Sequence, residues 1–99
     1  MRTKTGVLSP KSINTSSVAQ TSTQIAASSP TRSGLFVFNA SAENTLWIAP
    51  AITAAANGLG SIAIQPLQGQ WFTDQPFTNV MNAVFDAGTN AVTVWEFYE

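Results

Sequence analysis

A chain of 99 residues is short enough for one domain, and at 9% charged residues it is sparsely charged for a free monomer. It holds no histidine and no cysteine, which excludes disulfides, zinc sites built from these residues and the common nucleophilic triads. Hydrophobic residues reach 44%, and in a chain of this size they favour an oligomer or a component of a larger assembly.

The first third of the chain differs sharply from the rest. Every basic residue lies within the first 32 positions, whereas all acidic and all aromatic residues follow position 33. A Ser- and Thr-rich segment without aromatic residues buries too little apolar surface to order itself. Residues 1–33 are therefore predicted to be an extended N-terminal arm that contributes at most one or two strands, and residues 34–99 are predicted to form the body.

Short apolar runs in the body predict strands. Thr21–Ala27 is a weak strand candidate ahead of a turn at Ser28–Arg32. Leu35–Asn39 and Thr45–Ala49 then predict a central antiparallel hairpin. In its first strand, Phe36 and Phe38 share one face while Leu35 and Val37 share the other.

The second half of the body continues this pattern. Pro50–Gly60 is predicted to be a loop rather than a helical turn, and Ser61–Gln65 alternates with Ile62 and Ile64 facing inward. Three further strands are predicted, at Gln70–Phe72, Val80–Phe85 and Ala91–Phe97, with the last two forming a closing hairpin around Gly88. The frequent strand and turn signals indicate an all-β fold, a small antiparallel sandwich or barrel-like body.

Catalytic chemistry finds little support. The non-terminal carboxylates outside the strands, Glu43, Asp74 and Asp86, all lie in predicted turns, where such residues satisfy their own backbone. No cluster supplies metal ligands, and Gly58-Leu59-Gly60 precedes a strand rather than the helix of a phosphate loop. We assign no catalytic, metal or cofactor-binding residue, and we expect no cofactor and no enzymatic activity.

Two features suggest contacts with partners instead. Aromatic residues in the second half form a candidate interface: Trp71, Phe72, Phe77, Trp95, Phe97 and Tyr98. An alternative use is a sugar-stacking platform that includes Trp47, Trp71 or Trp95. Basic residues of the N-terminal arm form a candidate docking arm for an acidic protein surface such as a neighbouring subunit: Arg2, Lys4, Lys11 and Arg32. Four charges so widely spaced make nucleic acid an unfavoured partner.

Signal-peptide and membrane-spanning apolar stretches are absent, so we expect the chain to be made and used in a cytoplasm.

A series of segments, in order, carries a family resemblance. They are TQIAASSPTR (Thr23–Arg32), the apolar strand ending in Asn39, a TVYI-like strand at Thr45–Ile48, ANG (Ala56–Gly58), I-x-I-x-P (Ile62–Pro66) and GTNAVTVWE (Gly88–Glu96). In this order and spacing they resemble small β-sandwich virion proteins of tailed bacteriophages, which occur as head decoration, head-fibre and tail-associated components. Leu67–Asn79 is longer and more aromatic than the family pattern, and Phe97–Glu99 is an addition.

The resemblance implies a structural protein of the virion, assembled in the host cytoplasm. We expect an oligomeric capsid decoration or cement protein that contacts other copies of itself and the major capsid protein, with a trimer favoured because capsid shells offer three-fold sites. The alternatives are a tail, neck or fibre-associated structural protein, or a carbohydrate-binding β-module on the virion surface.

Overall fold

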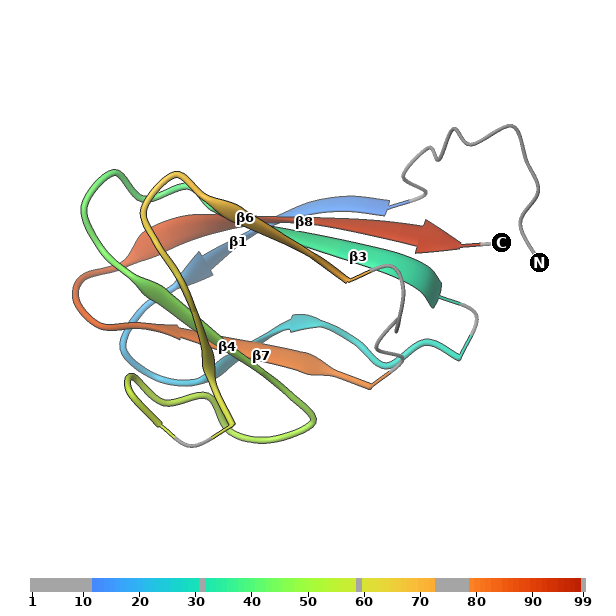
Figure 1. The fold of residues 1–99 in the computed structure, drawn as a ribbon, viewed down its shortest axis with the longest axis horizontal. Coiled ribbons are helices and arrows are strands. Elements are labelled where there is room, and N and C mark those ends of the chain that lie inside the picture. The colour runs from blue at the N-terminus through green and yellow to red at the C-terminus, as the bar shows by residue number, and fades with distance from the viewer. Residues whose placement is uncertain (1–11, 31, 59, 73–78, 99) are drawn as a thin grey trace.

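The computed structural model describes residues 12–30, 32–58, 60–72 and 79–98, which form two antiparallel four-stranded sheets packed together (Figure 1). Eight strands follow one another: β1 (Ser12–Val18), β2 (Thr23–Ala26), β3 (Arg32–Asn39), β4 (Leu46–Pro50), β5 (Ile62–Ile64), β6 (Gly69–Phe72), β7 (Met81–Phe85) and β8 (Asn90–Tyr98). The predicted all-β antiparallel sandwich is confirmed. Among the described residues there is no helix of the length and hydrophobicity that a membrane crossing requires.

The strand order follows a regular scheme. One sheet, sheet A, has the order β1-β8-β3-β6, and the other, sheet B, has the order β2-β7-β4-β5. The first strand thus pairs with the last, the second with the second-last, and so on inward to β4 and β5. Successive pairs alternate between the sheets, as they do when a long antiparallel ribbon is rolled up. This topology is the eight-stranded jelly roll.

Both hairpins predicted from the sequence are wrong, although the strands themselves are present. β3 lies in sheet A and β4 in sheet B, and β7 and β8 are likewise in different sheets. The connections at 40–45 and 86–89 therefore cross from one sheet to the other instead of turning within a sheet. Strand periodicity predicts a strand and its faces, but it does not specify the sheet that the strand joins.

A buried asparagine explains the crossing after β3. Asn39 is 0% exposed, and its Nδ2 donates hydrogen bonds to the carbonyl oxygens of Asn44 and Ile64, each at 2.9 Å. Its Oδ1 accepts a hydrogen bond from the N–H of Ser41 at 2.9 Å. Because Ile64 belongs to sheet B, this one side chain ties the end of a sheet A strand to the opposite sheet and shapes the connection between them.

The second crossing lies beside the first at the same end of the sandwich. The N–H of Thr45 donates to Oδ1 of Asp86 at 3.2 Å, and the N–H of Asp86 donates to the carbonyl of Thr45, also at 3.2 Å. Gly88 adopts a positive φ of 69°, as its position in a tight connection predicts. The two crossings therefore stabilise each other.

The first third of the chain contributes β1, β2 and the first residues of β3 to the two sheets. β1 pairs with β8 along its whole length, and β2, inside the predicted Thr21–Ala27 strand, pairs with β7. Val18 and Ile25 lie in the core between the sheets. Each sheet thus contains one strand from the segment that the sequence assigned to the arm, β1 in sheet A and β2 in sheet B. Residues 1–11, with Arg2, Lys4 and Lys11, lie outside the described residues.

The core between the sheets is formed by inward-facing aliphatic side chains and Phe85. The predicted loop after β4 is confirmed, with no helix in residues 51–58 or 60–61. Ile62 and Ile64 lie on the same side of β5, as predicted, but only Ile64 is buried, and Ile62 is 41% exposed. The reason is that β5 is a three-residue edge strand with a neighbouring strand on one side only.

Candidate functional site

The outer face of sheet A carries a row of aromatic side chains. Leu35 and Val37 of β3 are fully buried between the sheets, so strand alternation places Phe36 and Phe38 together on the outer face. In the sheet register, Trp95 of β8 and Trp71 of β6 both lie opposite Phe36, one on each side. Residues from three strands are therefore aligned across the sheet.

The rings of this row are in contact. The Phe36 ring centroid lies 4.4 Å from that of Trp71, 5.5 Å from that of Trp95 and 6.5 Å from that of Phe38. The Trp71 ring also lies 5.7 Å from the ring of Phe97. Tilted aromatic pairs at these distances are favourable. We call these five residues, Phe36, Phe38, Trp71, Trp95 and Phe97, the aromatic face.

Trp71 is the part of the aromatic face most open to a partner. Its side chain is 50% exposed, whereas Phe97 is 2% exposed and the other three rings are half-buried. A tryptophan on a supported aromatic base is the kind of residue that contributes most of the free energy in protein interfaces. It also presents the flat ring that stacking on a sugar would need.

Gly69 fixes the arrangement of these rings. A Cβ atom at this position would lie 2.3 Å from Cζ of Phe36, far inside contact distance. The Phe36 ring therefore lies directly over the backbone of β6, which brings it against Trp71. The aromatic face is built before any partner arrives.

The described surface carries very little charge. The acidic and basic side chains of the described residues are four, of which Arg32 and Glu96 are buried against each other. The other two, Glu43 and Asp86, are exposed in the crossing loops. Among the described residues, no charged side chain lies between the rings of the aromatic face.

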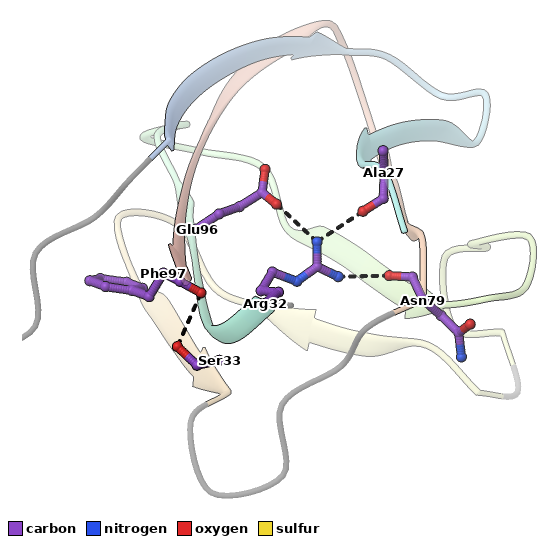
Figure 2. Close-up of polar contacts among 6 residues, drawn as sticks. All are labelled: Ala27, Arg32, Ser33, Asn79, Glu96 and Phe97. Carbon is purple, nitrogen blue, oxygen red and sulfur yellow. Dashed lines mark hydrogen bonds and ion pairs between the residues drawn. The ribbon is translucent and has the colours of Figure 1, made fainter. Parts of the chain in front are cut away.

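Arg32, predicted to belong to a docking arm, is instead an internal anchor of the body (Figure 2). It is 2% exposed, and its Nη1 lies 2.9 Å from Oε1 of Glu96 and donates to the carbonyl of Ala27 at 2.9 Å. Its Nη2 donates to the carbonyl of Asn79 at 2.8 Å. Arg32 thereby joins the β2–β3 connection, β8 and the segment that leads into β7, and it is not available for docking.

The alternation of residues in β8 contains a signal for the buried Arg32–Glu96 pair that the sequence analysis did not use. Val92, Val94 and Glu96 share one face of β8, and the two valines are fully buried. A carboxylate in line with two core residues must itself turn inward, and a buried carboxylate requires a cation or other strong donors. Arg32 supplies that cation from the neighbouring strand.

The remaining predicted residues do not join the aromatic face. Phe72 packs against the core between the sheets, Phe77 lies outside the described residues, and Tyr98 is placed only by its backbone at the end of β8. Trp47 is in the other sheet, packed with Ala49, Ala54 and Val84. Within the described structure its buried Nε1 has no hydrogen-bond partner.

Two residues of the aromatic face were missing from the predicted interface. Phe36 and Phe38 were correctly placed on a common face, but their face could not be matched with Trp71 and Trp95 before the β3 ladders were known. Trp71, Trp95 and Phe97 were among the candidates and do lie together.

Neither metal-binding groups nor similarity to known proteins indicates a function. No group of three or more potential metal ligands occurs in the described part of the chain. No protein-family model matches the sequence, and searches of curated proteins and of solved structures found no match. Function is therefore inferred from the aromatic face and from the sequence resemblance.

Proposed function

We propose that the protein is a structural component of a tailed-bacteriophage particle, an oligomeric decoration or cement protein of the head. The observation that carries the proposal is the aromatic face, a preassembled surface of five uncharged aromatic residues with Trp71 half exposed on its edge strand β6. In this role the aromatic face packs against neighbouring subunits, either other copies of the chain or the shell protein beneath. The resemblance of segments between Thr23 and Glu96 to phage virion proteins supports the same class.

The size of the aromatic face favours a protein bound within a larger assembly over one bound to a single partner. Even the whole outer face of sheet A, with four strands ~4.8 Å apart and about five residues long at ~3.3 Å per residue, spans only roughly 300 Å². A stable two-protein interface buries about 800 Å² on each partner. One sheet face is therefore too small by itself, and a protein that relies on it gains affinity where further surfaces are engaged together, as on an assembled shell.

The fold is compatible with this role but does not select it. Jelly rolls occur in viral capsid proteins and in lectins, and a fold by itself does not imply a function. A carbohydrate-binding module is the second candidate, favoured by the exposed Trp71 ring beside Phe36. If the protein binds glycans, adding them should quench the fluorescence of Trp71. If Trp71 serves only as a subunit contact, adding glycans should leave its fluorescence unchanged.

The deciding experiment measures binding of the purified protein to phage heads assembled without it. Burying the exposed half of a tryptophan, ~100 Å², is worth about 2.5 kcal/mol. Trp71→Ala should therefore weaken binding by tens of fold. The matched control is Ile52→Ala, because Ile52 is 47% exposed in the loop after β4 and lies outside the aromatic face. Unchanged binding by Trp71→Ala, or loss of equal size in both variants, would contradict the proposal.

A further inference from the structure

The two sheets have four edge strands, and three of them carry features that discourage pairing with another chain. β5 and β6 are only three and four residues long, and β2 has four residues with a register shift between Gln24 and Ala26. Short length and bulges are the common means by which proteins protect sheet edges. The fourth edge strand, β1, differs from these three.

β1 is long, regular and uncharged. Its seven residues, SINTSSV, contain no proline and no charged residue, and they pair with β8 from Ser12 to Val18 without a break. In the described part of the chain β8 is its only strand neighbour, and β1 lies at the margin of sheet A (blue in Figure 1). Within Ser12–Val18, the described part of this edge, none of the usual protective features is present.

Hydrogen-bond alternation shows which main-chain groups this edge presents. The N–H of Ala40 donates to the carbonyl of Ala91 at 3.2 Å, one step beyond the Asn39–Val92 pair of the β3–β8 ladder. Odd-numbered residues of β8 therefore direct their main-chain groups to β3, and even-numbered residues direct theirs to β1.

The even-numbered residues of β8 are the register partners of positions 12, 14, 16 and 18. The main-chain N–H and C=O groups of Ile13, Thr15 and Ser17 consequently point away from the sheet. These three donor and acceptor pairs are evenly spaced and centred on Thr15.

We propose that β1 pairs antiparallel with β1 of a second copy, about a two-fold axis at Thr15, so that two A sheets join into one continuous sheet. Thr15 then faces Thr15 of the other copy, and Ile13 faces Ser17 in both directions. These are hydrogen-bonded pairs, which supply about six main-chain hydrogen bonds. The pairing goes beyond the proposed function, because it is a property of the protein in solution whatever assembly it enters.

Several properties of β1 make a second copy the fitting partner. The outward groups are symmetric about Thr15, so the strand is complementary to itself under a two-fold rotation. No charge on β1 repels its own copy, and Thr15 and Ser17 are exposed residues of small size. Joining at β1 also places both aromatic faces on the same side of the sheet, within an outer face doubled to roughly 600 Å².

Single cysteines test the pairing and its register, because the chain contains no cysteine of its own. Across a hydrogen-bonded pair the two Thr15 Cα atoms would be ~5.5 Å apart, within the range of a disulfide. The two Ser17 Cα atoms would be displaced by about 13 Å along the strands, beyond that range. Gln24, exposed on edge strand β2, provides the control position.

Under mild oxidation, Thr15→Cys should form a covalent dimer at least tenfold faster than Ser17→Cys or Gln24→Cys at the same concentration. Circular dichroism verifies that each variant retains the β-fold. A Thr15→Cys rate no greater than that of Gln24→Cys would overturn the pairing. Equal rates for Thr15→Cys and Ser17→Cys would overturn the register at Thr15 and with it the two-fold arrangement.

Charge exchange gives a second, independent test without a covalent bond. Thr15→Lys and Thr15→Glu each place like charges opposite each other in a homodimer and should reduce self-association, measured by sedimentation, by about two- to fivefold. Mixing the two variants should restore dimers, because opposite charges then face each other. No restoration on mixing would contradict the pairing. If mixing fails to restore dimers but Trp71→Ala still loses binding to phage heads, the β1 pairing is wrong and the proposed function stands. The two proposals can therefore fail independently.

Discussion

The buried pair of Arg32 and Glu96 gives the most stringent prediction about what holds the sandwich together. The two charged atoms are 2.9 Å apart, and the side chains are 0% and 9% exposed. Glu96→Leu removes the negative charge and leaves the guanidinium buried with carbonyl oxygens such as those of Ala27 and Asn79. Breaking a buried pair in this way costs about 3–5 kcal/mol, against a total stability of about 5–15 kcal/mol for a domain.

Urea unfolding followed by tryptophan fluorescence measures this loss. Glu96→Leu should lower the free energy of unfolding by about 3–5 kcal/mol. The double variant Arg32→Met/Glu96→Leu should recover part of that loss, because no buried charge then remains without its partner. Raising the salt concentration to 1 M should change neither result much, since buried pairs are weakly screened.

The matched control is Glu43→Gln, because Glu43 is an exposed carboxylate in a crossing loop. It should change stability by no more than about 0.5 kcal/mol. A loss below about 1 kcal/mol in Glu96→Leu, the size expected of a surface pair, would refute the anchor described for Arg32. So would a double variant that is as unstable as the sum of its single variants, because the two residues would then be uncoupled.

Two further perturbations test the crossing and the aromatic face. Asn39→Leu leaves three main-chain partners unsatisfied, two of them in buried hydrogen bonds, and should cost about 2–5 kcal/mol, measured by urea unfolding. A loss under about 1 kcal/mol would show that the crossing does not depend on this side chain. Gly69→Ala should displace the Phe36 ring at a cost of about 1–3 kcal/mol and shift the emission of neighbouring Trp71, while an unchanged spectrum and stability would contradict the close contact.

The strands of the body were largely predictable because their apolar residues alternate. In β3, the alternation of Leu35 and Val37 with Phe36 and Phe38 identified the strand and separated its two faces, but not which of them is the inner one. β1 was not predictable in the same way, since SINTSSV shows no apolar alternation. It is held as a strand by its ladder with β8, a long-range contact that local sequence does not encode.

The strand topology could not be predicted from the sequence. Short connections between two β-prone runs usually indicate a hairpin, but hydrogen bonds from Asn39 to sheet B redirect the chain across the sandwich. The aromatic face depends on the same information, because Phe36 meets Trp71 and Trp95 only through ladders that join distant segments. Arg32 was misplaced for a related reason: its partner Glu96 lies 64 residues away.

The number of copies of this protein in purified phage particles tests the proposed function most directly. Quantitative mass spectrometry of particles from the phage that we propose encodes this sequence gives that number relative to the major capsid protein. A head decoration protein should be present on the order of hundreds of copies, because a repeating shell lattice offers many equivalent sites. A few copies per particle would contradict placement on the head, and complete absence would contradict the structural role itself.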